Sequence, residues 1–183
     1  MIFVSEPKTT PPETYRNYLH QKVYDTLQKL GIPFYRVDND DAITMDDCAS
    51  IAEKLDTPIV KTLLLCNRQQ TDFYLFVTTA DKPFSTKYFS RAMGISRVSF
   101  ASPEQLDRLL GTKVGATSVL SLLHDPDGCV KLAFDRQAIQ AQWYGCTDTT
   151  TTGYMKVPTA DLFDKFLPYT AHTPVILDLD SQE

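Results

Sequence analysis

The stretch VKTLLLCNRQQTDFYLFVTT, residues 60–79, decides the fold. Two apolar runs, Val60–Cys66 and Phe73–Thr79, flank the polar segment NRQQTD. Runs of this length and composition are typical of β-strands, and the polar segment between them is short enough for a hairpin turn. Strands joined by a short turn pair antiparallel, because a parallel pair needs a crossover of a dozen or more residues. We therefore expect a hairpin here and a sheet that is not doubly wound.

Helical and strand patterns are interspersed along the rest of the chain. Ser102-Pro103-Glu104-Gln105 carries the cap, the proline and the glutamine of a helix start. Helices are expected at 13–30, 44–55, 85–93, 102–111 and 159–166, and further strands at 32–37, 97–100, 129–134, 154–157 and 175–179. Several of the strands are joined by short turns. This order predicts an α+β fold with a mixed, largely antiparallel sheet flanked by helices.

Length and composition indicate one domain. The chain has 183 residues, of which 43% are hydrophobic, enough for one sizeable core. Residues 1–11 read as an N-terminal tail and 12–183 as a single domain. No run approaches the ~20 apolar residues of a membrane span, and the N-terminus lacks the basic-then-apolar order of a secretory signal. We expect a cytoplasmic protein without a membrane partner.

Net charge and cysteine content argue against several further kinds of function. The net charge of −5 argues against extended binding to DNA or long duplex RNA, but it permits a small footprint on one end of an RNA. The cysteines Cys48, Cys66, Cys129 and Cys146 lie far apart, and only three histidines accompany them. Neither a metal site nor another cofactor is expected, and reduced thiols are favoured over a catalytic Cys/His pair.

Lys61 lies within the first strand of the hairpin. Strand periodicity places it on one face with Ile59, Leu63 and Leu65, so its ammonium stands at the end of an apolar row. One interpretation is a first strand residue whose side chain extends into water. The other is an ammonium at the mouth of a pocket, placed to hold a phosphate or a developing oxyanion.

The segment GTKVGATS, residues 111–118, has two glycines in one loop. It lacks the Gly-Lys-Ser/Thr end of a P-loop and follows a helix. Gly111 is explained equally well as a helix C-cap, whereas Gly115 has no helix to cap. Glycine lets the backbone approach a ligand closely and present its N–H groups, which makes this loop a candidate binding segment.

A short segment is basic within an acidic protein. Between Asp81 and Arg97, the basic residues Lys82, Lys87, Arg91 and Arg97 face Asp81 alone, a local charge of 4 − 1 = +3. Lys87 and Arg91 share a helix face. This is either an ordinary solvated helix or a compact phosphate-binding patch.

Together these pieces resemble one family, the YbaK/prolyl-tRNA-synthetase-associated domain, and within it the freestanding alanyl-tRNA(Pro) deacylases of the ProX/PrdX type. The resemblance rests on five ordered stretches: VKTLLLCNRQQTDFYLFV, ADKPFSTKYFSRAMGISRVSFA, VGATSVLSLLHDPDGCVKLAFD, YGC and TADLFDKFLPYTAH. It extends from about Ile32 to the C-terminus. It implies a twisted, barrel-like mixed sheet flanked by helices.

The resemblance also implies site residues. Lys61 matches the lysine that holds the terminal nucleotide of the substrate, and Gly115, Ala116, Thr117 and Ser118 match the loop that lines the aminoacyl pocket. The stretch CTDTTTTGYMKV, residues 146–157, departs from the family. Thr147 and Asp148 stand where the family has His-Pro, Thr151 stands in the place of an asparagine, and Thr152 keeps the family threonine. These four residues are expected on the wall of the acyl pocket.

The activity implied by the resemblance is hydrolysis of mischarged tRNA(Pro), with alanyl-tRNA(Pro) as the expected substrate. The implied partners are the acceptor end of tRNA(Pro) and a prolyl-tRNA synthetase, and the basic residues Lys82, Lys87, Arg91 and Arg97 are our candidates for the contact with the acceptor stem. Two alternatives stay open. The changed wall would suit seryl or cysteinyl groups, or the chain is a non-catalytic tRNA- or synthetase-binding module of the same fold.

Overall fold

The computed structural model describes residues 1–42 and 44–179, so the expected domain end at residue 183 lies outside the described residues. The helices are α1 (Tyr18–Lys29), α2 (Met45–Leu55), α3 (Thr86–Met93), α4 (Pro103–Leu110), α5 (Thr159–Asp161) and α6 (Leu167–Thr170). The strands are β1 (Tyr35–Asp38), β2 (Val60–Cys66), β3 (Phe73–Thr79), β4 (Ser99–Phe100), β5 (Val130–Asp135), β6 (Trp143–Thr147), β7 (Gly153–Pro158) and β8 (Val175–Leu177). None of the helices in this part of the chain combines the length and the apolar composition that a membrane span requires.

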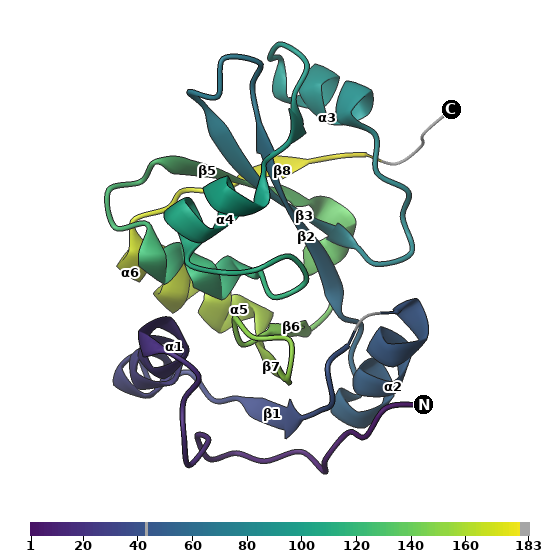
Figure 1. The fold of residues 1–183 in the computed structure, drawn as a ribbon, viewed down its shortest axis with the longest axis vertical. Coiled ribbons are helices and arrows are strands. Elements are labelled where there is room, and N and C mark those ends of the chain that lie inside the picture. The colour runs from purple at the N-terminus through teal and green to yellow at the C-terminus, as the bar shows by residue number, and fades with distance from the viewer. Residues whose placement is uncertain (43, 180–183) are drawn as a thin grey trace.

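Within the described residues, the strands form a five-stranded and a three-stranded sheet (Figure 1). The first has the order β4-β2-β3-β5-β8, and the second has the order β1-β7-β6. The hairpin predicted at residues 60–79 is confirmed, with Val60 opposite Thr79 and Cys66 opposite Phe73. The β3–β5 and β5–β8 pairs are parallel and the other pairs are antiparallel. The α+β class with a mixed, largely antiparallel sheet is therefore confirmed.

The two sheets meet at Gly145. An isolated parallel bridge joins Ile59, just before β2, to Gly145 in β6. A Cβ atom on Gly145 would lie 2.6 Å from the carbonyl oxygen of Pro58, so only glycine permits this approach. The barrel-like sheet implied by the resemblance thus takes the form of two open sheets that share a core and are joined, among the described residues, by this backbone bridge.

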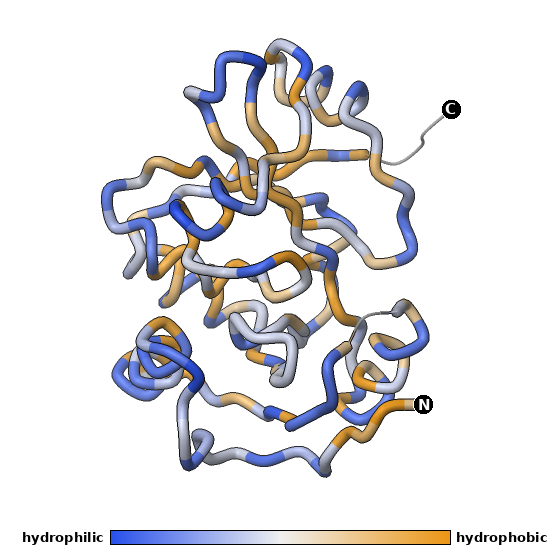
Figure 2. The backbone as a smooth tube through the Cα atoms, in the orientation of Figure 1, coloured by the Kyte–Doolittle hydropathy of each residue, from blue (hydrophilic) through white to orange (hydrophobic). Residues whose placement is uncertain are grey.

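The five-stranded sheet is buried on both faces. In β3, Phe73, Leu75 and Val77 face the main core shared with α1 and α4, whereas Tyr74 and Phe76 pack with Phe89 of α3. This alternation follows from the period of two along a strand. Figure 2 shows the resulting apolar stretches along the central strands. Full burial of each such side chain stabilises the fold by about 1.5–3 kcal/mol.

Capping residues set where the helices begin. The helix expected from Glu13 begins at Tyr18 instead, because the side chain of Asn17 caps it by accepting from the backbone N–H of His20 at 2.9 Å. The expected capping box of Ser102 and Gln105 is present at the start of α4.

The structure also contains elements that were not predicted from the sequence. Strand β6 is one of them. The last helix continues past Phe166 through a wider turn, Leu162–Phe166 (η3), and then α6 to Thr170.

The N-terminal segment, residues 1–10, runs beside β1. The backbone N–H of Lys8 donates to the carbonyl of Arg36 at 2.7 Å, and the N–H of Arg36 donates back at 2.8 Å. The N–H of Ser5 likewise donates to the carbonyl of Asp38 at 2.8 Å, and the N–H of Asp38 donates to the Ser5 hydroxyl at 2.9 Å. The segment therefore occupies the outer edge of the three-stranded sheet.

Candidate active site

The main cavity has a volume of about 800 Å³ and lies where β2, α2, the 111–118 loop and the end of β6 converge. Its walls are largely apolar, with a few polar groups that converge on it, which is the usual composition of a small-molecule site. The polar or charged residues on its wall include Thr44, Lys61, Thr62, Thr79, Asp81, Thr117, Gln137, Thr147 and Tyr154.

Lys61 lies on the wall of this cavity. Its position in β2, opposite Thr78, aims a partly buried side chain at the cavity, and its Nζ donates to the carbonyl of Lys82 at 2.7 Å. Partial burial lowers the pKa of the Lys61 ammonium, and the nearby carboxylate of Asp81 partly offsets that effect. One hydrogen bond leaves two further N–H donors of the ammonium for a ligand.

The glycine loop, residues 111–118, supplies another wall. Gly115 has φ +87°, a backbone conformation that favours glycine, and it lines the cavity together with Thr117. Ala116 and Ser118 are buried behind the wall. The Ser118 hydroxyl accepts from the N–H of Leu120 and begins the short helix η1 (Val119–His124). The structure thus brings Lys61, Gly115 and Thr117 to one cavity.

Thr147, the last residue of β6, ties this loop to the sheet. Its hydroxyl donates to the carbonyl of Ala116 at 2.6 Å and accepts from the N–H of Thr149 at 3.3 Å. Thr147 also lines the cavity. Its hydroxyl is therefore committed to the protein in both its donor and acceptor roles.

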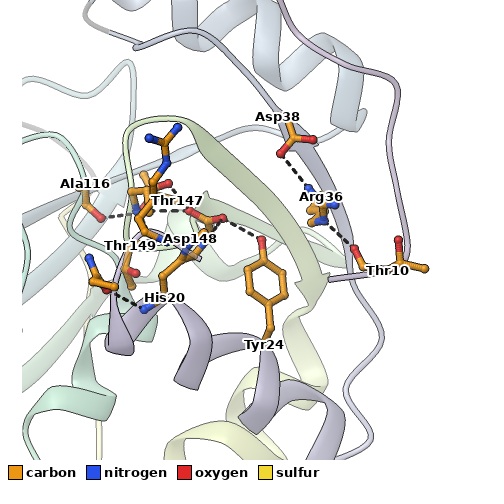
Figure 3. A network of polar contacts seen from close by, with 12 residues as sticks. Thr10, His20, Tyr24, Arg36, Asp38, Ala116, Thr147, Asp148 and Thr149 are labelled. Atoms are coloured by element: carbon orange, nitrogen blue, oxygen red, sulfur yellow. Dashed lines mark hydrogen bonds and ion pairs between the residues drawn. The ribbon is translucent and has the colours of Figure 1, made fainter. Parts of the chain in front are cut away.

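Asp148 points away from the main cavity, toward α1 (Figure 3). Its Oδ2 accepts from Tyr24 Oη at 2.7 Å and lies 2.8 Å from His20 Nε2. Its Oδ1 accepts from the N–H of Thr150 at 3.2 Å and from the Thr150 hydroxyl at 2.6 Å. Each oxygen thus takes part in two hydrogen bonds, which occupies the lone pairs of an ionised carboxylate.

The His20 ring has a defined tautomer. Its Nδ1 accepts from the backbone N–H of Arg16 at 3.0 Å, so the proton resides on Nε2, and this N–H donates to Asp148. Burial, and then the carboxylate of Asp148, raises the pKa of Tyr24 far above its ordinary value, so Tyr24 stays a neutral donor. Neither residue is predicted as a site residue from the sequence, although their spacing of four puts them on one face of α1.

The remaining residues of the threonine loop, Asp148–Thr152, have separate environments. Thr149 has φ +78°, which is rare for a β-branched residue, and its buried hydroxyl finds no partner among the described residues. The Thr151 hydroxyl donates to Asp41 at 2.6 Å, and a Cβ on Gly115 would lie 3.9 Å from the Thr151 methyl group. Thr151 therefore stands beside the glycine loop.

Thr152 and Asp148 line a second cavity of about 990 Å³, beneath the N-terminal segment. This cavity is mostly polar, and its walls include Arg36, Asp38 and Asn39 from β1 and the residue after it. Of the four residues expected on the acyl wall, only Thr147 thus lines the main cavity in the described chain, and Asp148 and Thr152 face the second one.

The structure separates the four basic residues. Lys87 and Arg91 are exposed on α3, and exposed Arg97 follows it, with its Nε donating to the Thr86 hydroxyl at 3.3 Å. Lys82 instead forms an ion pair with the buried carboxylate of Asp135 at 2.5 Å and donates to the carbonyl of Leu179. Lys87, Arg91 and Arg97 therefore remain as a basic surface, whereas Lys82 is an internal contact.

Two of the four thiols, those of Cys48 and Cys146, are poorly suited to nucleophilic chemistry. Burial raises the pKa of the Cys146 thiol to about 12, and partial burial raises the pKa of Cys48 on the cavity wall. Cys48, Cys66, Cys129 and Cys146 are all free. In the part of the chain that the structure describes, no group of three or more His, Cys, Asp or Glu side chains could hold a metal ion.

The sequence of this chain is similar to those of known proteins. The model of the aminoacyl-tRNA editing domain family matches residues 40–165. The chain is 26% identical over 164 residues to the prolyl-tRNA synthetase associated domain-containing protein 1 of Danio rerio, an alignment that covers 88% of each protein. It is 28% identical over 119 residues to the prolyl-tRNA editing protein ProX of Acetoanaerobium sticklandii, which covers 65% of this chain and 73% of that protein.

A solved structure supports the same fold. It is the crystal structure of a candidate trans-editing enzyme for prolyl tRNA synthetase, with a TM-score of 0.61 and 16% sequence identity. The match covers 88% of this chain and 98% of that one.

Proposed function

Because the chain belongs to the aminoacyl-tRNA editing domain family, we propose that it is a trans-editing deacylase that hydrolyses alanyl-tRNA(Pro) in the cytoplasm. Membership confirms the resemblance that the sequence predicted and the editing-hydrolase class that it implied. The acceptor end of tRNA(Pro) is the proposed partner, with a prolyl-tRNA synthetase as the enzyme whose errors are removed.

The observation that carries the proposal is the convergence of Lys61 and the glycine loop on one cavity. The Lys61 ammonium would hold the terminal nucleotide of the substrate. The backbone N–H groups of Gly115 and Thr117 would orient the carbonyl of the aminoacyl ester and stabilise the negative charge that develops on its oxygen, whereas the N–H of Ala116 donates to the carbonyl of Lys113 at 3.0 Å. Both groups act by positioning and electrostatics, which suffice for an ester that is already activated.

The reaction uses water as the nucleophile. Water adds to the ester carbonyl, the bond from the acyl carbon to the ribose oxygen breaks, and a free amino acid and a tRNA hydroxyl result. In our proposal the adjacent ribose hydroxyl of the substrate helps to activate that water. Asp148 is excluded as the base because its lone pairs are occupied, and the raised pKa values of Cys48 and Cys146 disfavour an acyl-thiol intermediate.

Hydroxyl groups near the cavity support alanine over serine as the acyl group. The Thr147 hydroxyl is committed to Ala116 and Thr149, and the Thr117 hydroxyl pairs with that of Thr112 at 2.8 Å. At these two threonines, a serine side chain would therefore have to compete with existing hydrogen bonds. The larger proline would be excluded by size, which a synthetase pocket cannot achieve against the smaller alanine, since the lost apolar contact is worth only ~1–3 kcal/mol.

A panel of charged tRNAs tests this function. Alanyl-, seryl-, cysteinyl- and prolyl-tRNA(Pro) are incubated with the wild type, with Lys61→Ala and with Lys131→Ala, an exposed lysine on β5 outside the cavity. We expect fastest release of alanine, a loss of roughly 10²–10³-fold in Lys61→Ala, and no change in Lys131→Ala. Binding of tRNA without turnover of any substrate would instead identify a non-catalytic module.

The surface formed by Lys87, Arg91 and Arg97 is the proposed acceptor-stem contact. Reversal of the charges at Lys87 and Arg91 should weaken tRNA binding and reduce the slope of log affinity against log salt by about 1–2, since each lost phosphate contact changes it by ~0.9. Unchanged affinity and slope would show that the surface is merely solvated.

A further inference from the structure

The threonine loop is held from the side opposite the main cavity. His20 and Tyr24, one turn apart on α1, both bond to the carboxylate of Asp148, whose side chain is only 3% exposed. These contacts join residues 128 and 124 positions apart in the sequence. Figure 3 shows the two α1 side chains directed at Asp148 and Thr147 directed at Ala116 on the other side.

Gly153 provides the space that this arrangement needs. A Cβ atom at this position would lie 2.2 Å from Oδ2 of Asp148 and 2.6 Å from its Cγ. The backbone N–H of Asp148 also donates to the carbonyl of Gly153 at 3.0 Å. The carboxylate therefore fits one location, against the backbone of β7 and beneath α1.

The same contacts hold a strained turn. Thr149 adopts φ +78° between Asp148 and Thr150, which are bonded to each other through the Asp148 carboxylate. A backbone conformation of this kind persists only where the surroundings over-determine it. The N–H of Thr149 in turn bonds to the Thr147 hydroxyl, which contacts the glycine loop through Ala116. A continuous series of contacts thus leads from α1 to the wall of the main cavity.

We propose that Asp148 is a positioning residue that sets the size of the acyl pocket. Held by His20 and Tyr24, it fixes the strained turn at Thr149 and so places the Thr147 hydroxyl against the carbonyl of Ala116. That contact determines how closely Thr147 and Gly115 approach each other across the cavity. This inference rests on the proposed function, but it assigns Asp148 a role through α1 and not on the acyl wall itself.

An asparagine cannot replace this carboxylate. In one orientation its amide N–H₂ would face the donors of His20 and Tyr24, and in the other it would face the donors of Thr150. Asp148→Asn thus disrupts the hydrogen bonds of the carboxylate without a change of side-chain volume.

Tyr24→Phe is the milder variant, since it removes only one hydrogen bond to Asp148. Tyr144→Phe is its matched control, because the buried hydroxyl of Tyr144 has no partner among the described residues.

The test combines selectivity with hydrogen exchange. For each variant the ratio of kcat/KM for alanyl-tRNA(Pro) to that for seryl-tRNA(Pro) is measured, together with amide exchange in residues 113–118 and 148–152. We expect Tyr24→Phe to lower the ratio about threefold to tenfold and to speed exchange in both segments, because small displacements of positioning groups have large effects on rate. Tyr144→Phe should leave both readouts unchanged.

Asp125→Asn is the control for a general loss of stability, since it disrupts a similar buried His–Asp pair formed with His172. If Tyr24→Phe and Asp148→Asn keep the wild-type ratio and the wild-type exchange in residues 113–118, Asp148 is only a structural residue and the proposal is overturned. If Asp148→Asn does not fold, Tyr24→Phe decides alone. Should the wild type hydrolyse no substrate, the proposed function fails, and hydrogen exchange still tests the coupling of α1 to the glycine loop.

Discussion

Two buried His–Asp pairs in this protein have nearly the same geometry. His20 Nε2 lies 2.8 Å from Oδ2 of Asp148, and His172 Nε2 lies 2.9 Å from Oδ2 of Asp125. Both aspartates also accept from backbone N–H groups that follow them in the chain, Thr150 in the first pair and Cys129 and Val130 in the second.

The pairs differ in what they hold. Asp125 begins the Asp-Pro-Asp-Gly turn that leads into β5, and His172 ties that turn to the end of α6. His172 Nδ1 finds no partner among the described residues, whereas His20 Nδ1 accepts from Arg16. Asp148 adjoins a strained loop and a cavity wall. The two pairs thus share a bonding pattern but hold different kinds of segment, a turn before a strand in one case and a strained loop beside a cavity in the other.

The largest effect is expected from alanine at the glycine beside the first pair. Gly153→Ala would displace the Asp148 carboxylate and its hydrogen bonds, with an expected loss of about 3 kcal/mol in the free energy of unfolding. Gly128→Ala, in the turn held by the second pair, has open space around the new methyl group and φ +69°, so a loss of about 1 kcal/mol is expected. Urea unfolding measures both, and equal losses would contradict the tight fit at Gly153.

A smaller difference is expected between the two histidines. Glutamine keeps a donor for the aspartate but offers no equivalent of the imidazole Nδ1. His20→Gln therefore loses the bond from the Arg16 N–H, whereas His172→Gln loses none at that atom. We expect His20→Gln to be the more destabilising by about 1 kcal/mol in urea unfolding. The reverse order would mean that the hydrogen bond to His20 Nδ1 makes no net contribution to the free energy of unfolding.

The smallest difference between the two pairs is expected at the left-handed residue next to each of them. Thr149 has φ +78° and Ala171 has φ +59°. Thr149→Gly removes the strain of a β-branched residue and an unpaired hydroxyl, and part of that gain is offset by chain entropy, so we expect stabilisation of about 1 kcal/mol. Ala171→Gly should change stability by less than about 0.5 kcal/mol. Thermal unfolding compares them, and destabilisation by Thr149→Gly would show that the turn is not strained.

Signals that act over short distances were readable from the sequence. The 60–79 hairpin and the capping box at Ser102 depend on residues within a few positions of one another, and the structure has both. The convergence of Lys61 and Gly115 on one cavity required the resemblance, because 54 residues (115 − 61) separate them in the sequence.

The direction of the Asp148 side chain could not be read in this way. Strand periodicity assigns faces within β6, but Asp148 is the first residue after it, and its partners lie on a helix more than 120 residues earlier. The environment of Lys82 could not be predicted from the sequence either. Its charge suggested a place in the basic patch, but its partner Asp135 is 53 positions away in the sequence and becomes its neighbour only in the folded protein.

The N-terminal segment has a consequence for handling the protein. A free strand edge presents unpaired N–H and C=O groups, which recruit strands from other molecules. Here Lys8 and Ser5 occupy the backbone groups of Arg36 and Asp38 that β1 would otherwise leave open. Removal of these residues would therefore expose the backbone N–H and C=O groups along the edge of β1. We expect the shortened protein to aggregate more readily at high concentration.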